Sequence, residues 1–307
     1  MTFRDRRLRK SRNSAAAQRD EFRLMLTLLQ ISDLHVGPPF LPRVAEALVR
    51  QVPALNADVI VANGDFTQRA TEEQFIQARA LLDQLPKVPT VHVPGNHDVP
   101  LYRVAERLLD PLSLYQKHIC SDLNSVLRVD GAVIVALDST APYSGITNGR
   151  ITRQQLGFCQ DAFQDSPKEA ARIVVAHHHF APAPDYERTF PMAQAKRAMN
   201  CFLELGVDLI LGGHLHRAYI GNSLDVYPGG ARRRGVIIAQ CGTTTSRRGR
   251  ARERERNSFN LIHIWENMLR VTHYMYFDDR DEFLPLSRHV FPRSGNALVE
   301  DELKRNA

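Results

Sequence analysis

Three short apolar runs in the first third of the chain constrain its fold most strongly. They cover residues 24–31, 58–62 and 89–93, and their length and composition indicate buried β-strands. Residues 41–52 between them carry apolar side chains at helical spacing, and residues 71–85 open with a helix-capping pattern. Strands that alternate with helices through short connections form parallel sheets. The sequence therefore predicts an α/β fold.

The rest of the chain continues this alternation and then changes character. The further predicted helices are residues 100–120, 152–163 and 191–205, and the further predicted strands are a hairpin at 126–137 and the segments 172–176 and 207–211. Four strand-like segments follow without an intervening helix, which predicts antiparallel pairing in a second sheet: 218–227, 235–240, 259–265 and 269–277. We expect one domain over residues 24–277, preceded by a basic arm at 1–23 and followed by a polar tail at 278–307.

Positive charge is concentrated in two segments, although the net charge is only +6. Residues 1–23 hold eight Arg and Lys against three acidic residues, and residues 231–256 hold nine Arg against two Glu. Segments of this kind are attracted to the phosphates of nucleotides, nucleic acids or anionic lipids. The alternative is that residues 1–23 are a disordered arm and residues 231–256 a solvated loop.

The sequence predicts a cytoplasmic location. No apolar run approaches the roughly 20 residues that span a bilayer. The basic start resembles a signal peptide, but Arg19, Asp20 and Glu21 lie where its apolar region would have to be. The four cysteines are widely spaced and form no C-x-x-C pair, which favours reduced thiols. Peripheral attachment to a membrane through the Arg-rich segments is the alternative.

Polar clusters follow five of the predicted strands at their carboxyl ends. They are Asp33-Leu34-His35, Asn63-Gly64-Asp65, Asn96-His97-Asp98, His177-His178-His179 and Gly213-His214-Leu215-His216. Each cluster alone could be a polar turn, but the carboxyl edge of such a sheet is where α/β folds bind ligands. Asp, Asn and His side chains together favour Mn, Fe or Zn, whereas Ca²⁺ prefers oxygen ligands alone. Their joint placement predicts a transition-metal site.

This ordered set resembles the calcineurin-like metallophosphoesterase superfamily, whose signature runs D-x-H, G-D, G-N-H-D/E, H and G-H-x-H. The resemblance implies a four-layer α-β-β-α sandwich with two central mixed sheets and a dinuclear metal site at the carboxyl ends of the strands. It also implies two divalent or trivalent transition-metal ions. The first would be held by Asp33, His35, Asp65 and His216. Asp65 would bridge to the second, which Asn96, His178 and His214 would complete.

The histidine triplet leaves the fourth block open to interpretation. The family often has His-x-Pro there, and Phe180 occupies the place where Pro would match His178. We choose His178 as the ligand, with His177 and His179 as alternatives. His179 could instead face the substrate.

The resemblance also implies a mechanism of phosphoester hydrolysis. Two cations lower the pKa of a bridging water, and the resulting hydroxide attacks phosphorus in line with the leaving oxygen. His97 would be the general acid or a donor to the phosphoryl oxygens. Asp98 would orient His97, or would be the N-cap of a helix that begins after it, at Val99-Pro100.

Two segments refine the resemblance towards a substrate class. Residues 64–70 and 93–100 are similar to those of bacterial class III cyclic nucleotide phosphodiesterases. The same branch is similar to hydrolases that cut the pyrophosphate of UDP-diacylglucosamine, and DNA-repair exonucleases are a third comparison. The nuclease hypothesis is weakened because aromatic residues do not alternate with the basic ones. A non-catalytic binding scaffold on the same fold is the alternative from another class.

Two further predictions concern the rim of the site. Tyr143 and Arg150, in the loop that follows residue 138, are candidate substrate contacts, or they order that loop. Residues 101–114 are rich in apolar side chains and are either a core helix, which we favour, or an apolar flap for a lipid substrate.

Overall fold

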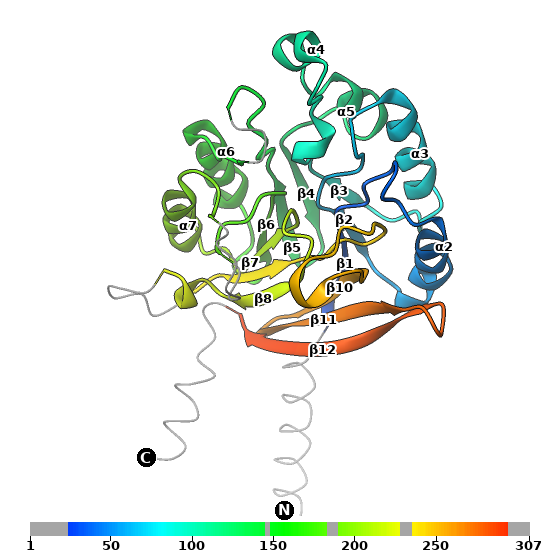
Figure 1. Ribbon diagram of the computed structural model, residues 1–307. Coiled ribbons are helices and arrows are strands. Elements are labelled where there is room, and N and C mark those ends of the chain that lie inside the picture. The colour runs from blue at the N-terminus through cyan, green and yellow to red at the C-terminus, as the bar shows by residue number, and fades with distance from the viewer. Residues whose placement is uncertain (1–23, 145–147, 183–189, 228–234, 294–307) are drawn as a thin grey trace, which may run out of the picture.

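Two six-stranded mixed sheets lie face to face at the centre of the computed structural model (Figure 1), which describes residues 24–144, 148–182, 190–227 and 235–293. The predicted basic arm at 1–23 and the arginines at 232–234 lie outside the described residues. Helices cover the outer face of each sheet, so the order of layers is α-β-β-α. The predicted four-layer fold is confirmed.

The first sheet has the strand order β12-β11-β10-β1-β2-β3. Its strands are β1 (Leu24–Ile31), β2 (Val59–Ala62), β3 (Thr90–His92), β10 (Ser258–Trp265), β11 (Met268–Phe277) and β12 (Glu282–Pro292). The three predicted early strands β1, β2 and β3 are parallel, as the short crossovers require. Strands β10, β11 and β12 extend this sheet by antiparallel pairing from β1 outward.

The second sheet has the strand order β4-β5-β6-β7-β9-β8. Its strands are β4 (Ser125–Val129), β5 (Ala132–Ala136), β6 (Ala171–Val175), β7 (Leu209–Gly212), β8 (Tyr219–Asn222) and β9 (Ile237–Gln240). The predicted β4–β5 hairpin and the antiparallel β8–β9 pair are present, but β9 also runs parallel to β7. The prediction that the late strands form their own antiparallel sheet was therefore wrong, because they are divided between both sheets.

Helices pack on the two outer faces of the sheets. They are α2 (Pro42–Gln51), α3 (Glu72–Leu82), α5 (Ser113–His118), α6 (Arg153–Gln164) and α7 (Ala195–Glu204), while the short α4 (Val104–Leu109) lies apart from them. The cluster on the first sheet includes Leu48 of α2 and Phe75 of α3, and that on the second includes Phe163 of α6 and Phe202 of α7. A third apolar cluster fills the space between the sheets.

Strand β1 shows why the sequence of a central strand is apolar almost throughout. Successive side chains point to opposite faces, so Leu26 and Leu28 pack between the sheets while Leu29 and Ile31 pack against helices. Both faces are buried, which removes the alternation of polar and apolar residues that a half-exposed strand shows.

The predicted polar tail was wrong for residues 282–292, which form the edge strand β12. An edge strand with one solvated face needs few apolar residues, and here Phe283 supplies the anchor by packing on Phe259 and Tyr276. Residues 294–307 lie outside the described residues.

Residues 100–120 form two short helices instead of one core helix. Tyr115 of α5 is fully buried, but α4 buries none of its residues, and Leu109 is 84% exposed. The core-helix prediction was therefore wrong for α4, which lies at the top of Figure 1 away from both sheets. No helix in the described part of the chain combines the length and apolarity needed to cross a bilayer.

Candidate metal centre

Five loops meet where the parallel strands of both sheets end. Backbone hydrogen bonds join neighbouring loops, from Asp33 N to Gly64 O and from Gly213 N to His177 O. A contact between the sheets is added by the backbone N–H of His214, which donates to Oδ2 of Asp33 over 3.0 Å. The predicted carboxyl-edge clusters are thus brought into one site.

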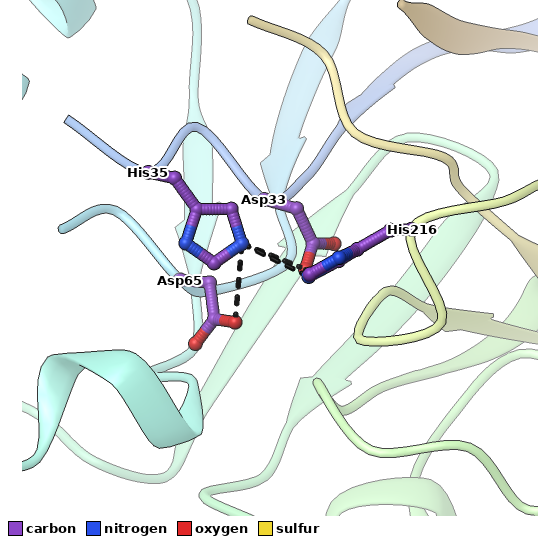
Figure 2. Close-up of side chains that lie close together, drawn as sticks. All are labelled: Asp33, His35, Asp65 and His216. Atoms are coloured by element: carbon purple, nitrogen blue, oxygen red, sulfur yellow. Dashed lines mark hydrogen bonds and ion pairs between the residues drawn. The ribbon is translucent and has the colours of Figure 1, made fainter. Parts of the chain in front are cut away.

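The first predicted ligand set converges on a single point (Figure 2). Asp33, His35, Asp65 and His216 are all buried, and each offers a ligand atom within 4.8 Å of the other three. His216 Nε2 lies 3.1 Å from Asp33 Oδ1, and His35 Nε2 lies 3.6 Å from Asp65 Oδ2. Imidazole nitrogens and carboxylate oxygens at these positions suit a transition-metal ion.

The unsatisfied atoms of this cluster fit a bound cation. Asp33 Oδ1 and Asp65 Oδ2 are buried without a hydrogen-bond partner, although buried polar atoms are normally satisfied. The Nε2 atoms of His35 and His216 lie 2.9 Å apart, a distance at which only one of them can carry a proton. Burial acts to raise the pKa of Asp33, but the adjacent imidazoles of His216 and His35 hold it well below its usual value.

Backbone strain marks the same residues. Asp33, His35, Asp65, His214 and His216 all have φ between 49° and 71°, in the left-handed region. That conformation costs a residue with a side chain roughly 1–2 kcal/mol, and glycine would adopt it freely. These five residues share this conformation in the loops where the proposed ligand sets meet.

A second group of donors lies beside Asp65. His214 Nδ1 is 2.8 Å from Asn96 Oδ1, and His177 Nε2 is 3.4 Å from Asp65 Oδ2. His177 Nδ1 contacts the Asn63 carbonyl at 2.6 Å, which leaves Nε2 as the ring atom that can bind a metal ion. Burial lowers the pKa of His177, but the carboxylates of Asp65 and Asp33 outweigh it and raise the pKa to about 9. The site therefore attracts positive charge at Nε2 of His177.

The structure distinguishes the three histidines of the triplet. His178, the ligand chosen from the sequence, turns Nδ1 to the Ser139 hydroxyl at 2.9 Å. His179 stacks on His214, with ring centroids 5.5 Å apart. Of the three, His177 contacts the Asp65 carboxylate, with Nε2 3.4 Å from Oδ2, and this geometry favours His177 as the donor next to Asp65.

His97 lies over the first cluster, as predicted, but its partner differs from the predicted one. Its ring is edge-on to His35 with centroids 4.8 Å apart, and its Nδ1 contacts the Gln68 carbonyl at 3.0 Å. Burial lowers the pKa of His97, an effect that the Asp65 charge partly offsets. With Nδ1 held by a carbonyl, Nε2 is the atom left for proton transfer.

Asp98 organises the loop instead of orienting His97. Its carboxylate accepts from the backbone N–H groups of Gly95, Phe66 and Thr67 at 2.9, 3.2 and 3.0 Å. Burial, together with the Asp65 charge, raises the pKa of Asp98 to about 7. The predicted pairing with His97 was therefore wrong, and so was the predicted helix cap, since Asp98 ends the short 3₁₀ turn Asn96–Asp98.

Two glycines allow these loops to approach one another. A Cβ atom on Gly64, whose φ is +81°, would lie 2.8 Å from His177 Nδ1. A Cβ atom on Gly95 would lie 2.2 Å from Asp65 Oδ1. Both glycines belong to the sequence motifs, and their role is close contact around Asp65.

Tyr143 and Arg150 are not brought into the ligand clusters. They line a separate cavity of about 760 Å³ together with Asp138, and Tyr143 is 69% exposed. This cavity borders the site through Ser139, whose carbonyl accepts from the Arg150 backbone and whose hydroxyl contacts His178. Contact of either residue with substrate stays a prediction.

Two further polar elements belong to the site, and the sequence pointed only to the second of them. Between the sheets, the Gln30 amide of β1 donates to Asn63 Oδ1 at 3.1 Å and to the Gly212 carbonyl of β7 at 3.0 Å, which ties the ends of both sheets together. At the rim, Arg248 donates to Gln68 Oε1 at 3.0 Å. Buried amides in strands carry no distinctive spacing, whereas the Arg-rich segment did signal phosphate binding.

The chain belongs to the calcineurin-like phosphoesterase family, whose model matches residues 26–218. No match was found among curated protein sequences. A dimetal phosphatase from Danio rerio is similar in structure, with 12% identity, a TM-score of 0.61 and coverage of 89% of this chain and 100% of that one. A purple acid phosphatase from yellow lupin has 11% identity and a TM-score of 0.61, covering 88% of this chain and 54% of that one. PhoD gives 11% identity and a TM-score of 0.63, covering 87% and 72%.

These structural similarities support the fold, and the family match identifies a metallophosphoesterase. The buried Asp and His cluster suits the two metal ions of such an enzyme. A phosphoester is therefore the class of substrate.

Proposed function

We propose that the protein hydrolyses a phosphodiester or pyrophosphate bond with two transition-metal ions, Mn, Fe or Zn. Asp33, His35, Asp65 and His216 would hold the first ion. Asp65, Asn96, His177 and His214 would hold the second, with His177 replacing His178 in the set predicted from the sequence. The observation that carries the proposal is the position of Asp65 Oδ2, which lies 3.6 Å from His35 Nε2 and 3.4 Å from His177 Nε2.

The protein groups around the ligand sets have separate tasks. Two bound ions would supply Lewis-acid activation of water and of a phosphoryl oxygen. His97 presents Nε2 to the same space, fixed by the Gln68 carbonyl, and we assign it proton donation to the leaving oxygen. The Asp98 carboxylate holds the loops of Asp65 and His97 at a constant separation through its three backbone contacts.

The substrate within this class is a nucleotide in our proposal. The support comes from the similarity of residues 64–70 and 93–100 to class III cyclic nucleotide phosphodiesterases. Hydrolysis of UDP-diacylglucosamine is the second candidate, because α4 exposes apolar side chains and the exposed Tyr102 just before it contacts Arg69. A DNA exonuclease has no specific contact in its favour. The cytoplasmic location, and contact of residues 231–256 with membranes or nucleic acid, likewise stay predictions.

A metal-dependent assay tests this function and separates it from a binding scaffold. Chelator-treated protein would be supplied with Mn²⁺ and given bis-p-nitrophenyl phosphate, cyclic AMP, UDP-diacylglucosamine and single-stranded DNA. We expect Mn²⁺-dependent release of p-nitrophenol and hydrolysis of a nucleotide substrate. Failure to bind transition metal and to hydrolyse any of the four would support the scaffold and overturn the proposal.

A further inference from the structure

Arg248 is the arginine of the Arg-rich segment that is fixed at the rim of the metal centre. Its guanidinium donates to Gln68 Oε1 at 3.0 Å, while the Gln68 carbonyl contacts His97 Nδ1. Its own carbonyl contacts His216 Nδ1 at 3.1 Å. Arg248 is therefore connected directly to a predicted metal ligand and, through one residue, to the predicted proton donor.

The surroundings of Arg248 are cationic. Arg69, Arg247 and Arg248 line a cavity of about 430 Å³ with Pro38, Pro39 and Gln68, and the lining includes no carboxylate. Arg248 is half-buried, so burial lowers its pKa, while the Asp65 and Asp33 charges act in the opposite direction. Arg69 is held in place by its contact with the Tyr102 ring, with its guanidinium carbon 5.1 Å from the ring centroid.

The charges at the centre exceed what one phosphodiester can balance. The two proposed ligand sets contain only the carboxylates of Asp33 and Asp65, against two ions of at least double charge. A phosphodiester with its single negative charge already balances part of that surplus. The half-buried Arg248 and the exposed Arg69 and Arg247 add three positive charges beside it, and a further anion would compensate the partly desolvated guanidinium of Arg248.

We propose that Arg248, assisted by Arg69 and Arg247, binds a second phosphate of the substrate, adjacent to the phosphorus that is hydrolysed. The substrate is then a diester of diphosphate, such as a nucleoside diphosphate joined to another group. This inference rests on the proposed function, because it adds a subsite to the same metal centre.

The placement of Arg248 beside His97 assigns the second phosphate to the leaving side. Water provides the oxygen that bonds to the attacked phosphorus, and the bridging P–O bond breaks. The departing phosphate keeps the bridging oxygen and its electron pair. One proton of the water goes to solvent, and His97 donates to the departing oxygen and recovers its proton from solvent. Arg248 compensates the charge that develops on the departing phosphate.

A comparison of two substrates, one with two phosphates and one with a single phosphate, tests the subsite. Wild type, Arg248→Ala, Arg248→Lys and the control Arg254→Ala would be assayed with UDP-glucose and with bis-p-nitrophenyl phosphate in Mn²⁺. Arg254 lies on the same segment but is exposed and outside this cavity. We expect Arg248→Ala to lower the ratio of kcat/KM for UDP-glucose to that for the single-phosphate ester by about tenfold to hundredfold. Arg248→Lys should restore part of the ratio, and Arg254→Ala should keep the wild-type value.

A binding measurement tests the second-phosphate subsite without depending on catalysis. Calorimetry would compare α,β-methylene-ADP with AMP on the Mn²⁺-loaded wild type and on Arg248→Ala. We expect the wild type to prefer the diphosphate analogue by about tenfold and the variant to lose that preference. Equal loss on both assay substrates, or an unchanged preference for the analogue, would overturn the second-phosphate subsite. Absence of all hydrolysis by the wild type would overturn the proposed function instead, while the calorimetry would still decide on the subsite.

Discussion

The two halves of the candidate metal centre differ in composition and in exposure. The first set combines two carboxylates with two imidazoles, all of them buried, and its donor atoms lie within 4.8 Å of one another. The second shares Asp65 and adds an amide, Asn96, and two imidazoles, the buried His177 and the partly exposed His214. The first half is therefore a fully buried cluster, whereas the second reaches the surface at His214.

The difference shows how local geometry decides between neighbouring residues. In the first half each ligand is fixed by a motif with a single candidate. In the second, three adjacent histidines compete, and a shift of one residue turns a side chain to the opposite side of the backbone. His177 follows β6 closely enough to reach Asp65, and His178 turns to Ser139.

Removing the shared carboxylate would break both halves at once. Asp65→Asn keeps an oxygen for the His97 backbone N–H, which now lies 2.7 Å from Asp65 Oδ1, but it removes the charge between the two sets. We expect loss of most bound metal and a fall in kcat/KM on bis-p-nitrophenyl phosphate of about 10³-fold or more. Metal analysis by mass spectrometry alongside the assay would measure both. A variant that retained two ions and full activity would contradict the shared role of Asp65.

Substitutions in the histidine triplet should affect only the second half of the metal centre. His177→Ala should lose the second ion and about 10²- to 10³-fold of activity, because it removes a donor facing Asp65. The matched variant His178→Ala should keep both ions and stay within about tenfold of wild type. The opposite result for the two variants would restore His178 as the ligand.

Proton donation should be separable from metal binding in either half. His97→Ala is expected to retain both ions yet lose about 10²-fold of activity on a substrate with a poor leaving group. The loss should be smaller with bis-p-nitrophenyl phosphate, whose leaving group departs without protonation. Loss of metal from this variant would mean that His97 is itself a ligand.

The smallest predicted effect is on stability and concerns Asp138, in the loop that contacts His178 through Ser139. Burial raises the pKa of Asp138 to about 6, so between about pH 4 and pH 6 the folded state retains a proton that the unfolded state releases. Ionised Asp138 then destabilises the fold above pH 6. Asp138→Asn should raise the free energy of unfolding by about 1–3 kcal/mol at about pH 7.5 and by almost nothing below pH 4. Urea denaturation at both pH values would measure this, and a gain that did not depend on pH would contradict the assignment.

The fold was predictable where both faces of a strand are buried. Residues 24–31, 58–62 and 89–93 gave clear apolar runs, and their ends located the polar clusters. Strand β12 was missed because an edge strand has one solvated face and therefore shows no continuous apolar run. Its place in the sheet comes from antiparallel pairing with β11, which lies before it in the chain.

The site was predictable at the level of loops and less so at the level of atoms. The resemblance to the metallophosphoesterases implied Asp33, His35, Asp65 and His216 as one ligand set, and the fold brings these four side chains together. The assignment of Asp98 failed because its three backbone partners come from loop packing, which short-range spacing does not encode. Arg248 and Gln68 are 180 residues apart in the chain, so only the fold brings them together.

Titration of metal-free protein with Mn²⁺, while hydrolysis of bis-p-nitrophenyl phosphate is followed, tests the two-metal account most directly. We predict that two equivalents bind per chain and that activity rises only as the second half fills. Full activity at one equivalent, or activity without bound metal, would contradict it.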